Sequence, residues 1–157
     1  MREIKIFVAS SINELEIERL EIGDFIRRIN DNLRDQNIRI VKEMCEYESN
    51  AISTNGRKQE DYNELIRNSD FFYMLIGEKV GQYTIEEFNE ALNRLKTTQK
   101  NPAITVFFKN LPKEKLAEGI DNFKTKLAEE KINYLTYGDV KTITSHLQSE
   151  ITDFLNA

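Results

Sequence analysis

Glutamates cluster after an apolar run in the middle of the chain, within the stretch 70–95 (DFFYMLIGEKVGQYTIEEFNEALNRL). Apolar residues recur there at the spacing of one helix face: Ile85, Phe88, Leu92 and Leu95. Because helical residues advance by about 100° each, Glu87 lies on the flank of that face, one turn before Ala91. Glu86 and Glu90 are expected to point to solvent. The small Ala91 leaves free space beside Glu87, as a substrate pocket requires, so Glu87 is the candidate catalytic carboxylate.

The chemistry open to Glu87 depends on its charge. A carboxylate in the first turn of a helix is favoured in its ionised form by the helix dipole. An ionised carboxylate can act as a nucleophile or stabilise a developing positive charge. The neighbouring Glu86 and Glu90 act in the opposite sense, because like charges raise the pKa of a carboxyl group. The sequence leaves open which effect wins.

Glu87 also has a purely structural interpretation. Thr84-x-x-Glu87 fits the capping-box pattern, in which the two side chains satisfy backbone N–H groups at a helix start. Ser11-x-x-Glu14 fits the same pattern, and there capping is the favoured interpretation. For Glu87 the spacing alone fits catalysis and capping equally well.

Several other chemistries are not expected. The chain contains neither G-x-x-x-x-G-K-[ST] nor G-x-G-x-x-G, the patterns of the phosphate loop and the dinucleotide fingerprint. His146 is the single histidine and is expected at the surface of the last helix, beside core Leu147, so we predict no histidine-based triad and no metal site. Cys45 has no evident activating partner and is expected to be a small buried or half-buried thiol.

Two further side chains could contact a ligand. Tyr83 could stack on a ring or merely cover the sheet edge, and Arg57 could neutralise a phosphate or simply mark an exposed helix start. The acidic Glu46 and Glu48 are expected to belong to a solvated loop.

The composition predicts one soluble domain over residues 1–157, either a whole protein or the N-terminal domain of a longer one. Hydrophobic residues make up 39% of the chain and charged residues 31%. The net charge is −5 without a basic stripe, which argues against nucleic acid and anionic membranes as partners. The single cysteine excludes an intrachain disulfide, and no signal peptide is visible after Met1, so we expect a cytoplasmic protein.

Five apolar runs alternate with five helical patterns. The predicted strands are 4–9, 38–41, 71–76, 103–108 and 132–135, and the predicted helices are 11–35, 58–68, 84–95, 112–127 and 140–155. Strict alternation predicts an α/β fold with a five-stranded parallel sheet in the flavodoxin-like order 2-1-3-4-5 and helices on both faces. The switch point then lies between the first and third strands. The loops that meet there carry Ser10–Ser11 and Gly77–Thr84.

Three segments resemble the bacterial TIR-like (Toll/interleukin-receptor) superfamily: KIFVASS (5–11), INELEIERLEIGDFIRRIN (12–30) and GRKQEDYNELIRNSDFFYMLIGEKVGQYTIEEFNEAL (56–92). The likeness spans most of residues 3–95, and beyond Pro102 it is mainly one of layout. The core T-x-x-E-F-x-x-A (84–91) also resembles the nucleoside deoxyribosyltransferase relatives. In both groups a glutamate at this place acts on the anomeric carbon of an N-glycosidic bond.

The resemblance implies an NAD+ glycohydrolase or cyclase, with NAD+ as substrate, no further cofactor and Glu87 as the catalytic carboxylate. It implies self-association through the segment 45–57, and bacterial members serve antiphage defence. Many TIR domains carry a tryptophan just before the glutamate; this chain has none, and Tyr83 is expected in its place. The expected substrate-binding residues are Ala9, Ser10, Ser11, Arg57, Tyr83 and Thr84.

Two alternatives remain at this point. One is a non-catalytic TIR-like interaction module in which Glu87 only caps its helix. The other is a nucleoside or nucleotide N-glycosidase of the deoxyribosyltransferase type, which would spare NAD+ and release a free base.

Overall fold

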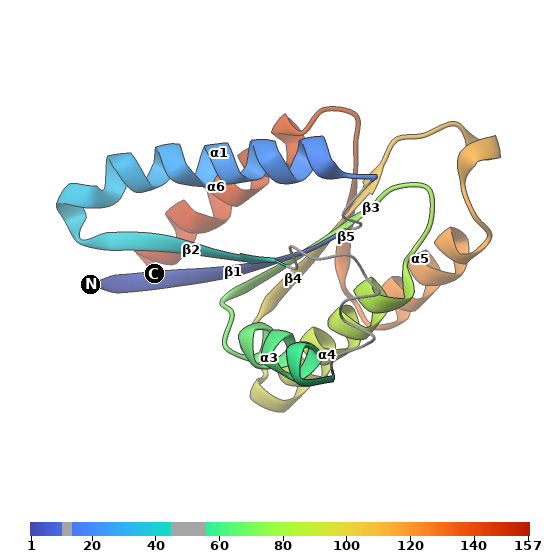
Figure 1. Cartoon of the computed structure of the whole chain (residues 1–157), viewed down its shortest axis with the longest axis horizontal. Coiled ribbons are helices and arrows are strands. Elements are labelled where there is room, and N and C mark those ends of the chain that lie inside the picture. The colour runs from blue at the N-terminus through green and yellow to red at the C-terminus, as the bar shows by residue number, and fades with distance from the viewer. Residues whose placement is uncertain (11–13, 45–55) are drawn as a thin grey trace.

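The central element is a five-stranded sheet in which every neighbouring pair of strands is parallel. The computed structural model describes residues 1–10, 14–44 and 56–157, with side chains from residue 60 onward in the last range. The strand order is β2-β1-β3-β4-β5, with helices on both faces (Figure 1). This confirms the predicted fold class and strand order.

The element bounds follow the predicted runs closely. The strands are β1 (Arg2–Ser10), β2 (Ile38–Met44), β3 (Phe71–Ile76), β4 (Ala103–Lys109) and β5 (Asn133–Tyr137). The helices are α1 (Glu16–Leu33), α3 (Gly56–Arg67), α4 (Gln82–Thr98), α5 (Gly119–Glu129) and α6 (Lys141–Asn156), with short 3-10 turns η1 (Arg34–Gln36) and η2 (Lys113–Lys115). Helices α1 and α6 cover one face of the sheet, and α3, α4 and α5 lie on the other (Figure 1).

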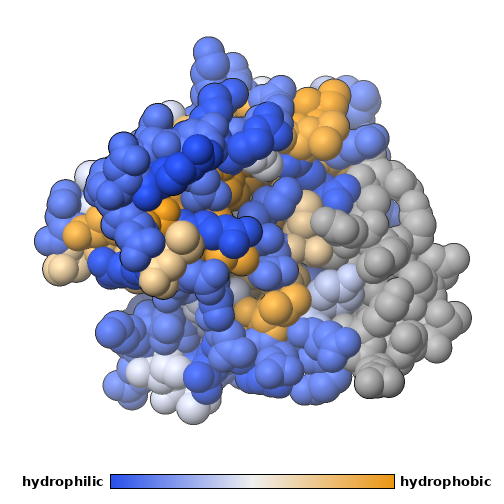
Figure 2. Space-filling model, turned by 60° about the vertical axis from the view of Figure 1, so that its left-hand side comes forward, coloured by the Kyte–Doolittle hydropathy of each residue, from blue (hydrophilic) through white to orange (hydrophobic). Residues whose placement is uncertain are grey.

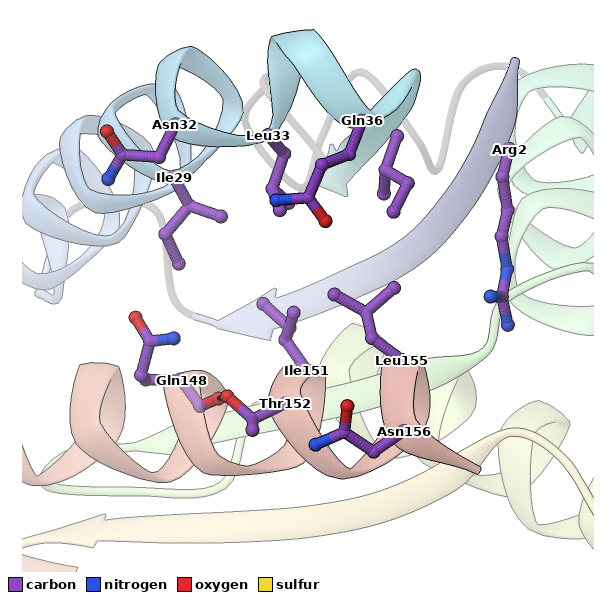
Figure 3. A pocket seen from close by; sticks show the side chains of 11 residues that line it. Arg2, Ile29, Asn32, Leu33, Gln36, Gln148, Ile151, Thr152, Leu155 and Asn156 are labelled. Atoms are coloured by element: carbon purple, nitrogen blue, oxygen red, sulfur yellow. Dashed lines mark hydrogen bonds between the residues drawn. The ribbon is translucent and has the colours of Figure 1, made fainter.

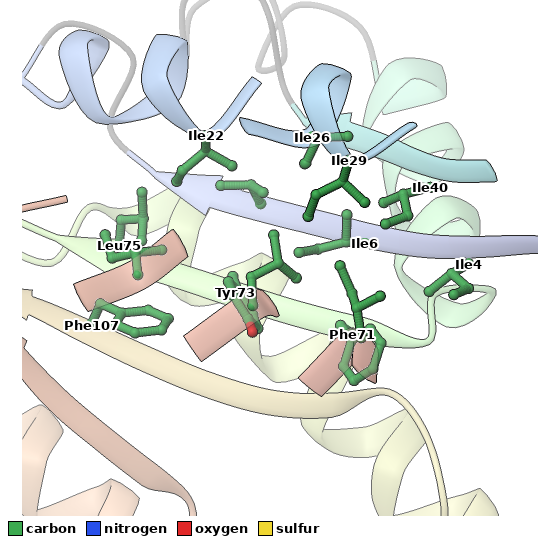
Figure 4. Close-up of a cluster of buried hydrophobic side chains, with 14 of the residues drawn as sticks. Ile4, Ile6, Ile22, Ile26, Ile29, Ile40, Phe71, Tyr73, Leu75 and Phe107 are labelled. Atoms are coloured by element: carbon green, nitrogen blue, oxygen red, sulfur yellow. The ribbon is translucent and has the colours of Figure 1, made fainter. Parts of the chain in front are cut away.

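β3 is the centre of the core, since all six of its residues are buried. Alternate side chains along a strand point to opposite faces. Phe71, Tyr73 and Leu75 therefore join the cluster under α1 and α6, together with Ile6 and Ile22 (Figure 4). The other three residues join the cluster under α4 and α5. Burial on both faces explains why this strand is a continuous apolar run.

Two predicted helix starts were wrong. α1 begins at Glu16 with no side-chain cap, so Glu14 precedes the helix and does not complete a capping box; Ser11 lies outside the described residues. The helix predicted from Pro112 is two elements, because the chain is extended at Leu116 (φ −87°, ψ 130°) before α5 begins at Gly119.

His146 is half-buried, which corrects the predicted surface position. Its ring packs on Tyr73 and Phe107, with centroids 5.8 and 5.6 Å away. Its Nε2 lies 3.1 Å from Oε1 of Glu150, the same oxygen that accepts a hydrogen bond from the Tyr73 hydroxyl. Burial raises the pKa of the Tyr73 hydroxyl, and the charge of Glu150 adds to this effect. The ring reaches this position because residue 146 lies next to the buried side of α6, which Ile143, Leu147 and Ile151 form.

The described part of the chain contains no helix that is both long and apolar enough to cross a membrane.

The side chain of Asn30 pairs with the backbone of one residue on the β2 edge of the sheet. β2 is an edge strand, and the amide of Asn30 on α1 donates to the carbonyl of Ile40 (3.0 Å) and accepts from its N–H (2.7 Å). Both backbone groups are thereby satisfied without a further strand.

We expect Asn30→Ala to lower the free energy of unfolding by about 1–3 kcal/mol, because it leaves these two groups of Ile40 unpaired. Urea denaturation measures this change. The matched control is Asn32→Ala, on an exposed position of the same helix, which gains the same helix propensity. Equal stability of the two variants would contradict the role of Asn30.

Candidate functional site

The carboxyl ends of β1 and β3 lie side by side, where Ser10 pairs with Leu75. α4 packs against both strands and begins directly beyond this edge. In open parallel sheets, ligands bind at the carboxyl edge beside such a switch point. The fold therefore brings the predicted loops together at the expected place.

α4 begins at Gln82, with Gly81 as an extended N-cap and no side-chain cap hydrogen bond. Thr84 is then the third helical residue and Glu87 the sixth, so the capping-box interpretation of this pair is wrong. The expectation of a first-turn carboxylate fails for the same reason. Glu87 thus has no capping role that would account for it.

Glu87 is a buried carboxyl group, only 5% exposed, on the inward side of α4 beside fully buried Phe88 and Ala91. Its Oε2 has no hydrogen-bond partner among the residues that the structure describes. Burying an unpaired polar group costs free energy, so such atoms are rare and call for a physical explanation. An oxygen that bonds to a substrate provides one.

Burial raises the pKa of Glu87 from an ordinary 4.5 to about 8, and the charge of adjacent Glu86 adds to the effect. At neutral pH the free protein therefore favours the protonated form of Glu87. This is the opposite of the ionised form that the helix dipole alone would favour. Burial has the larger effect on the pKa because the influence of the helix dipole falls off within the first turn, and Glu87 is the sixth residue of α4.

Glu90 does not point freely to solvent, as we expected. Its Oε1 lies 2.6 Å from Nη1 of Arg67 on α3, and that guanidinium also pairs with Glu60 at 2.9 Å. The pKa of Arg67 is raised by its hydrogen bonds to these two carboxylates. Pairing with Arg67 offsets the charge of Glu90, which leaves Glu86 as the like charge that acts on Glu87.

The other predicted site residues lie at the same edge, in different environments. Ala9 is buried in the cluster under α4. Ser10, the last residue of β1, is half-buried and lies on the opposite face of the sheet, the one that α1 covers, because side chains alternate along a strand. Tyr83 is half-buried and Thr84 buried in the first turn of α4. The predictions for Ser11, the side chain of Arg57, and Cys45, Glu46 and Glu48 fall outside the described part of the structure.

The prediction missed a second buried carboxyl group at this edge. Glu18 on α1 is 5% exposed and accepts from the Tyr137 hydroxyl (2.8 Å) and from Nζ of Lys109 (3.0 Å). Burial alone would raise the pKa of Glu18, but these hydrogen bonds outweigh it and lower the pKa below its ordinary value. A signal existed in the sequence, since Glu18 interrupts the apolar stripe between Leu15 and Ile22.

A small cavity near this edge was also not predicted from the sequence. It measures about 70 Å³ and lies at the carboxyl ends of β3, β4 and β5, where Gly77, Asn110, Lys124 and Thr136 are among its lining residues. The Lys124 ammonium lies 4.9 Å from the centre of the Phe108 ring and has no carboxylate partner within the described ranges. The cavity has room for a few water-sized groups, and a phosphate group is of comparable size.

A larger groove of about 330 Å³ lies at the opposite, amino edge of the sheet, between the C-terminal parts of α1 and α6. Ile29 and Ile151 face each other across it, and amide side chains such as Gln36 and Gln148 line it (Figure 3). The surface of the side that Figure 2 brings forward is mostly hydrophilic, with small separate hydrophobic areas. This groove is remote from Glu87, and we assign no chemistry to it.

Within residues 1–10, 14–44 and 56–157, no three His, Cys, Asp or Glu side chains are arranged to hold a metal ion.

No protein-family model matches the chain, and no curated protein sequence does. A solved structure, the Clostridium botulinum CMP N-glycosidase BcmB, is similar, with a TM-score of 0.51 and 18% identity over 93% of this chain and 98% of that one. At this level of identity the likeness shows a shared fold.

We expect Glu87→Gln to become more stable relative to the wild type as the pH rises from 5 to 8. In this range the unfolded wild-type chain loses the Glu87 proton while the folded chain keeps it, so wild-type stability falls with pH. A tenfold change in protonation equilibrium is worth about 1.4 kcal/mol, so the effect is on the order of 4 kcal/mol at most. Urea denaturation at a series of pH values measures it.

The matched control is Glu86→Gln, which removes the same charge from an exposed neighbouring position. Its stability relative to the wild type should rise much less over this pH range, because Glu87 stays buried and only the smaller contribution of Glu86 to its raised pKa is lost. An identical pH dependence of both variants would contradict the raised pKa of Glu87.

Proposed function

We propose that the protein hydrolyses the N-glycosidic bond of a nucleotide, with Glu87 as the catalytic carboxylate. The observation that carries this proposal is the buried Oε2 of Glu87, which has no partner among the described residues and lies on the helix that begins beyond the carboxyl edge of β1 and β3. The failure of the capping interpretation adds support, because it removes the structural explanation for this residue. The shared fold with a CMP N-glycosidase favours a nucleoside monophosphate as substrate.

In the proposed reaction, the bond from the anomeric carbon to the base nitrogen breaks and its electron pair leaves with the base. The sugar develops the positive charge of an oxocarbenium-like transition state. An ionised Glu87 stabilises that charge or forms a transient bond to the anomeric carbon. Water then gives its hydroxyl group to the anomeric carbon, which yields ribose phosphate and releases Glu87, and the remaining proton of the water goes to the departed base. Hydrogen bonds donated to Glu87 by the sugar hydroxyls would favour its ionised form in the complex.

NAD+ is the second candidate substrate, and it is favoured by the burial of Glu87, which disfavours the ionised carboxylate in the free protein. The nicotinamide ring of NAD+ is positively charged, and a nearby positive charge lowers the pKa of a carboxyl group. Bound NAD+ would thereby ionise Glu87, and nicotinamide would leave without needing a proton. Both candidates require the same catalytic carboxylate and differ in the leaving group.

We expect the wild type to release free base from CMP or nicotinamide from NAD+, and Glu87→Gln to lose this activity by about 10²–10⁴-fold. Chromatography of the products measures the release. The protein should be assayed at high concentration as well, because we also propose that it self-associates. Glu86→Gln, with a circular-dichroism melt of each variant, is the control and should stay active.

The pH profile tests the role of Glu87. If it acts in its ionised form, kcat/KM rises with pH toward about 8, the pKa of Glu87 in the free protein. Glu86→Gln should move this rise to lower pH, because Glu86 contributes to the raised pKa. Absence of release from CMP, cytidine and NAD+ by the wild type, or undiminished release by Glu87→Gln, would contradict the proposal.

We expect Lys124→Gln to raise the KM for CMP by about tenfold and to leave the KM for cytidine unchanged. A charge-assisted hydrogen bond to phosphate is worth about 1.5–3 kcal/mol, and Lys124 is the cation that lines the small cavity without a carboxylate partner in the described structure. Steady-state kinetics on both substrates measure the change. Lys141→Gln, on an exposed residue, controls for the loss of one positive charge. Equal effects on CMP and cytidine would contradict a phosphate contact.

A further inference from the structure

Three loops at the carboxyl edge of the sheet meet at the backbone of one residue, Glu78. Its N–H donates to Oε1 of Glu14, which lies between β1 and α1. Its carbonyl accepts from the N–H of Ala117, which lies between β4 and α5, at 2.9 Å. The β3–α4 loop is thus held from both sides, by the loop after β1 and by the loop after β4.

The Glu14 carboxylate occupies the space that a side chain at position 77 would take, so this contact depends on Gly77. A Cβ atom at Gly77 would lie 2.5 Å from the carboxyl carbon of Glu14, far inside the 3.5–4.0 Å of an ordinary carbon–carbon contact. The carboxylate therefore lies directly against the backbone that follows β3. Any side chain at position 77 would force one of the two groups to move.

Glu14 is not a helix cap. α1 begins at Glu16 with Leu15 as its N-cap, and no side-chain hydrogen bond caps this helix. The carboxylate of Glu14 instead crosses to the loop after β3, on the far side of the switch point between β1 and β3. Its role concerns the geometry of this edge and not the start of its own helix.

The loop that Glu14 holds leads directly to the helix of Glu87. Gly77 follows β3, and α4 begins at Gln82, four residues after Glu78. Loops with few buried contacts are the first parts of a protein to open. In catalysis, a displacement of about 1 Å can cost a hundredfold in rate. A hydrogen bond in the middle of this loop therefore restricts the loop itself and the start of α4.

We propose that Glu14 is a positioning residue of the active site: its carboxylate fixes the Gly77–Glu78 backbone and thereby sets the position of the loop that leads into α4 and Glu87. This inference rests on the proposed N-glycosidase function. Glu14 acts through the loop and does not need to touch the substrate.

A double-mutant cycle between Glu14 and Gly77 tests the inference. Glu14→Ala should lower kcat by about tenfold or more with a smaller change in KM, and Glu14→Gln, which keeps an acceptor oxygen, should restore most of the activity. Gly77→Ala should lower kcat by about as much as Glu14→Ala, because its methyl group displaces the flexible carboxylate of Glu14 from the Glu78 N–H. In the double variant the carboxylate is gone, so the added methyl group should cost little further activity.

Hydrogen exchange of the Glu78 amide provides a readout that does not depend on activity. Its protection should fall in Glu14→Ala and persist in Glu21→Ala, which removes a charge from an exposed position on α1. The overall melting temperature should change little in either variant.

The possible failures are distinguishable. If the wild type releases base and Glu14→Ala keeps its kcat, or keeps its Glu78 protection, the positioning role is overturned and the proposed function stands. Additive losses in the Glu14 and Gly77 cycle would overturn the inference as well. If the wild type releases no base from any nucleotide, the proposed function fails and the positioning role fails with it.

Discussion

The burial of β3 on both faces is the constraint on which the remaining structure depends. Its six residues divide evenly between two hydrophobic clusters, so a shift by one residue would exchange the side chains of the two clusters and disturb the packing of both. Its start is tied to the neighbouring strands through Asp70, whose side chain and backbone bond to Lys5 and whose carbonyl accepts from Ala103. With the body of the strand fixed in this way, its carboxyl end always emerges beside that of β1. The loop to α4, and Glu87 with it, must lie at this switch point.

Two buried carboxyl groups at this edge differ in their hydrogen bonding, and this difference distinguishes a structural residue from a candidate catalytic one. Glu18 and Glu87 are equally inaccessible, at 5% exposure each. The hydroxyl of Tyr137 and the ammonium of Lys109 bind Glu18, and its pKa is lowered despite burial. Burial dominates at Glu87, and its pKa is raised to about 8. Hydrogen bonds outweigh burial at Glu18, whereas Glu87 lies deeper and its Oε2 has no partner among the described residues, so burial sets its pKa. A satisfied carboxylate joins α1 to β4 and β5, whereas an unsatisfied one stores free energy that a ligand can recover.

The fold could be predicted from the sequence because its signals are repeated and agree: five apolar runs, five helical stripes and strict alternation. Predictions failed where one local pattern competed with a tertiary contact. Thr84-x-x-Glu87 has the capping spacing, but the helix starts at Gln82, so the motif lies inside it. Glu14 also has that spacing and instead bonds across the switch point to Glu78. The spacing placed Glu87 beside Ala91 on the flank of the apolar helix face, so its burial could be predicted. Its ionisation depends on the groups that pack around it, and residue spacing does not reveal these.

A buried carboxyl group with a pKa near 8 is mostly protonated in an empty site at neutral pH. In the proposed reaction it must become ionised, and the free energy for this change has to come from the ligand. Hydroxyl donors of a ribose or the charge of a nicotinamide ring can provide it, whereas a ligand that brings neither leaves Glu87 neutral and unreactive. The same burial that makes the free protein less stable above about pH 5 would then restrict catalysis to ligands with the right donors. Substrate selection and the cost of burying Glu87 would thus be two consequences of one oxygen atom that finds no partner in the described part of the chain.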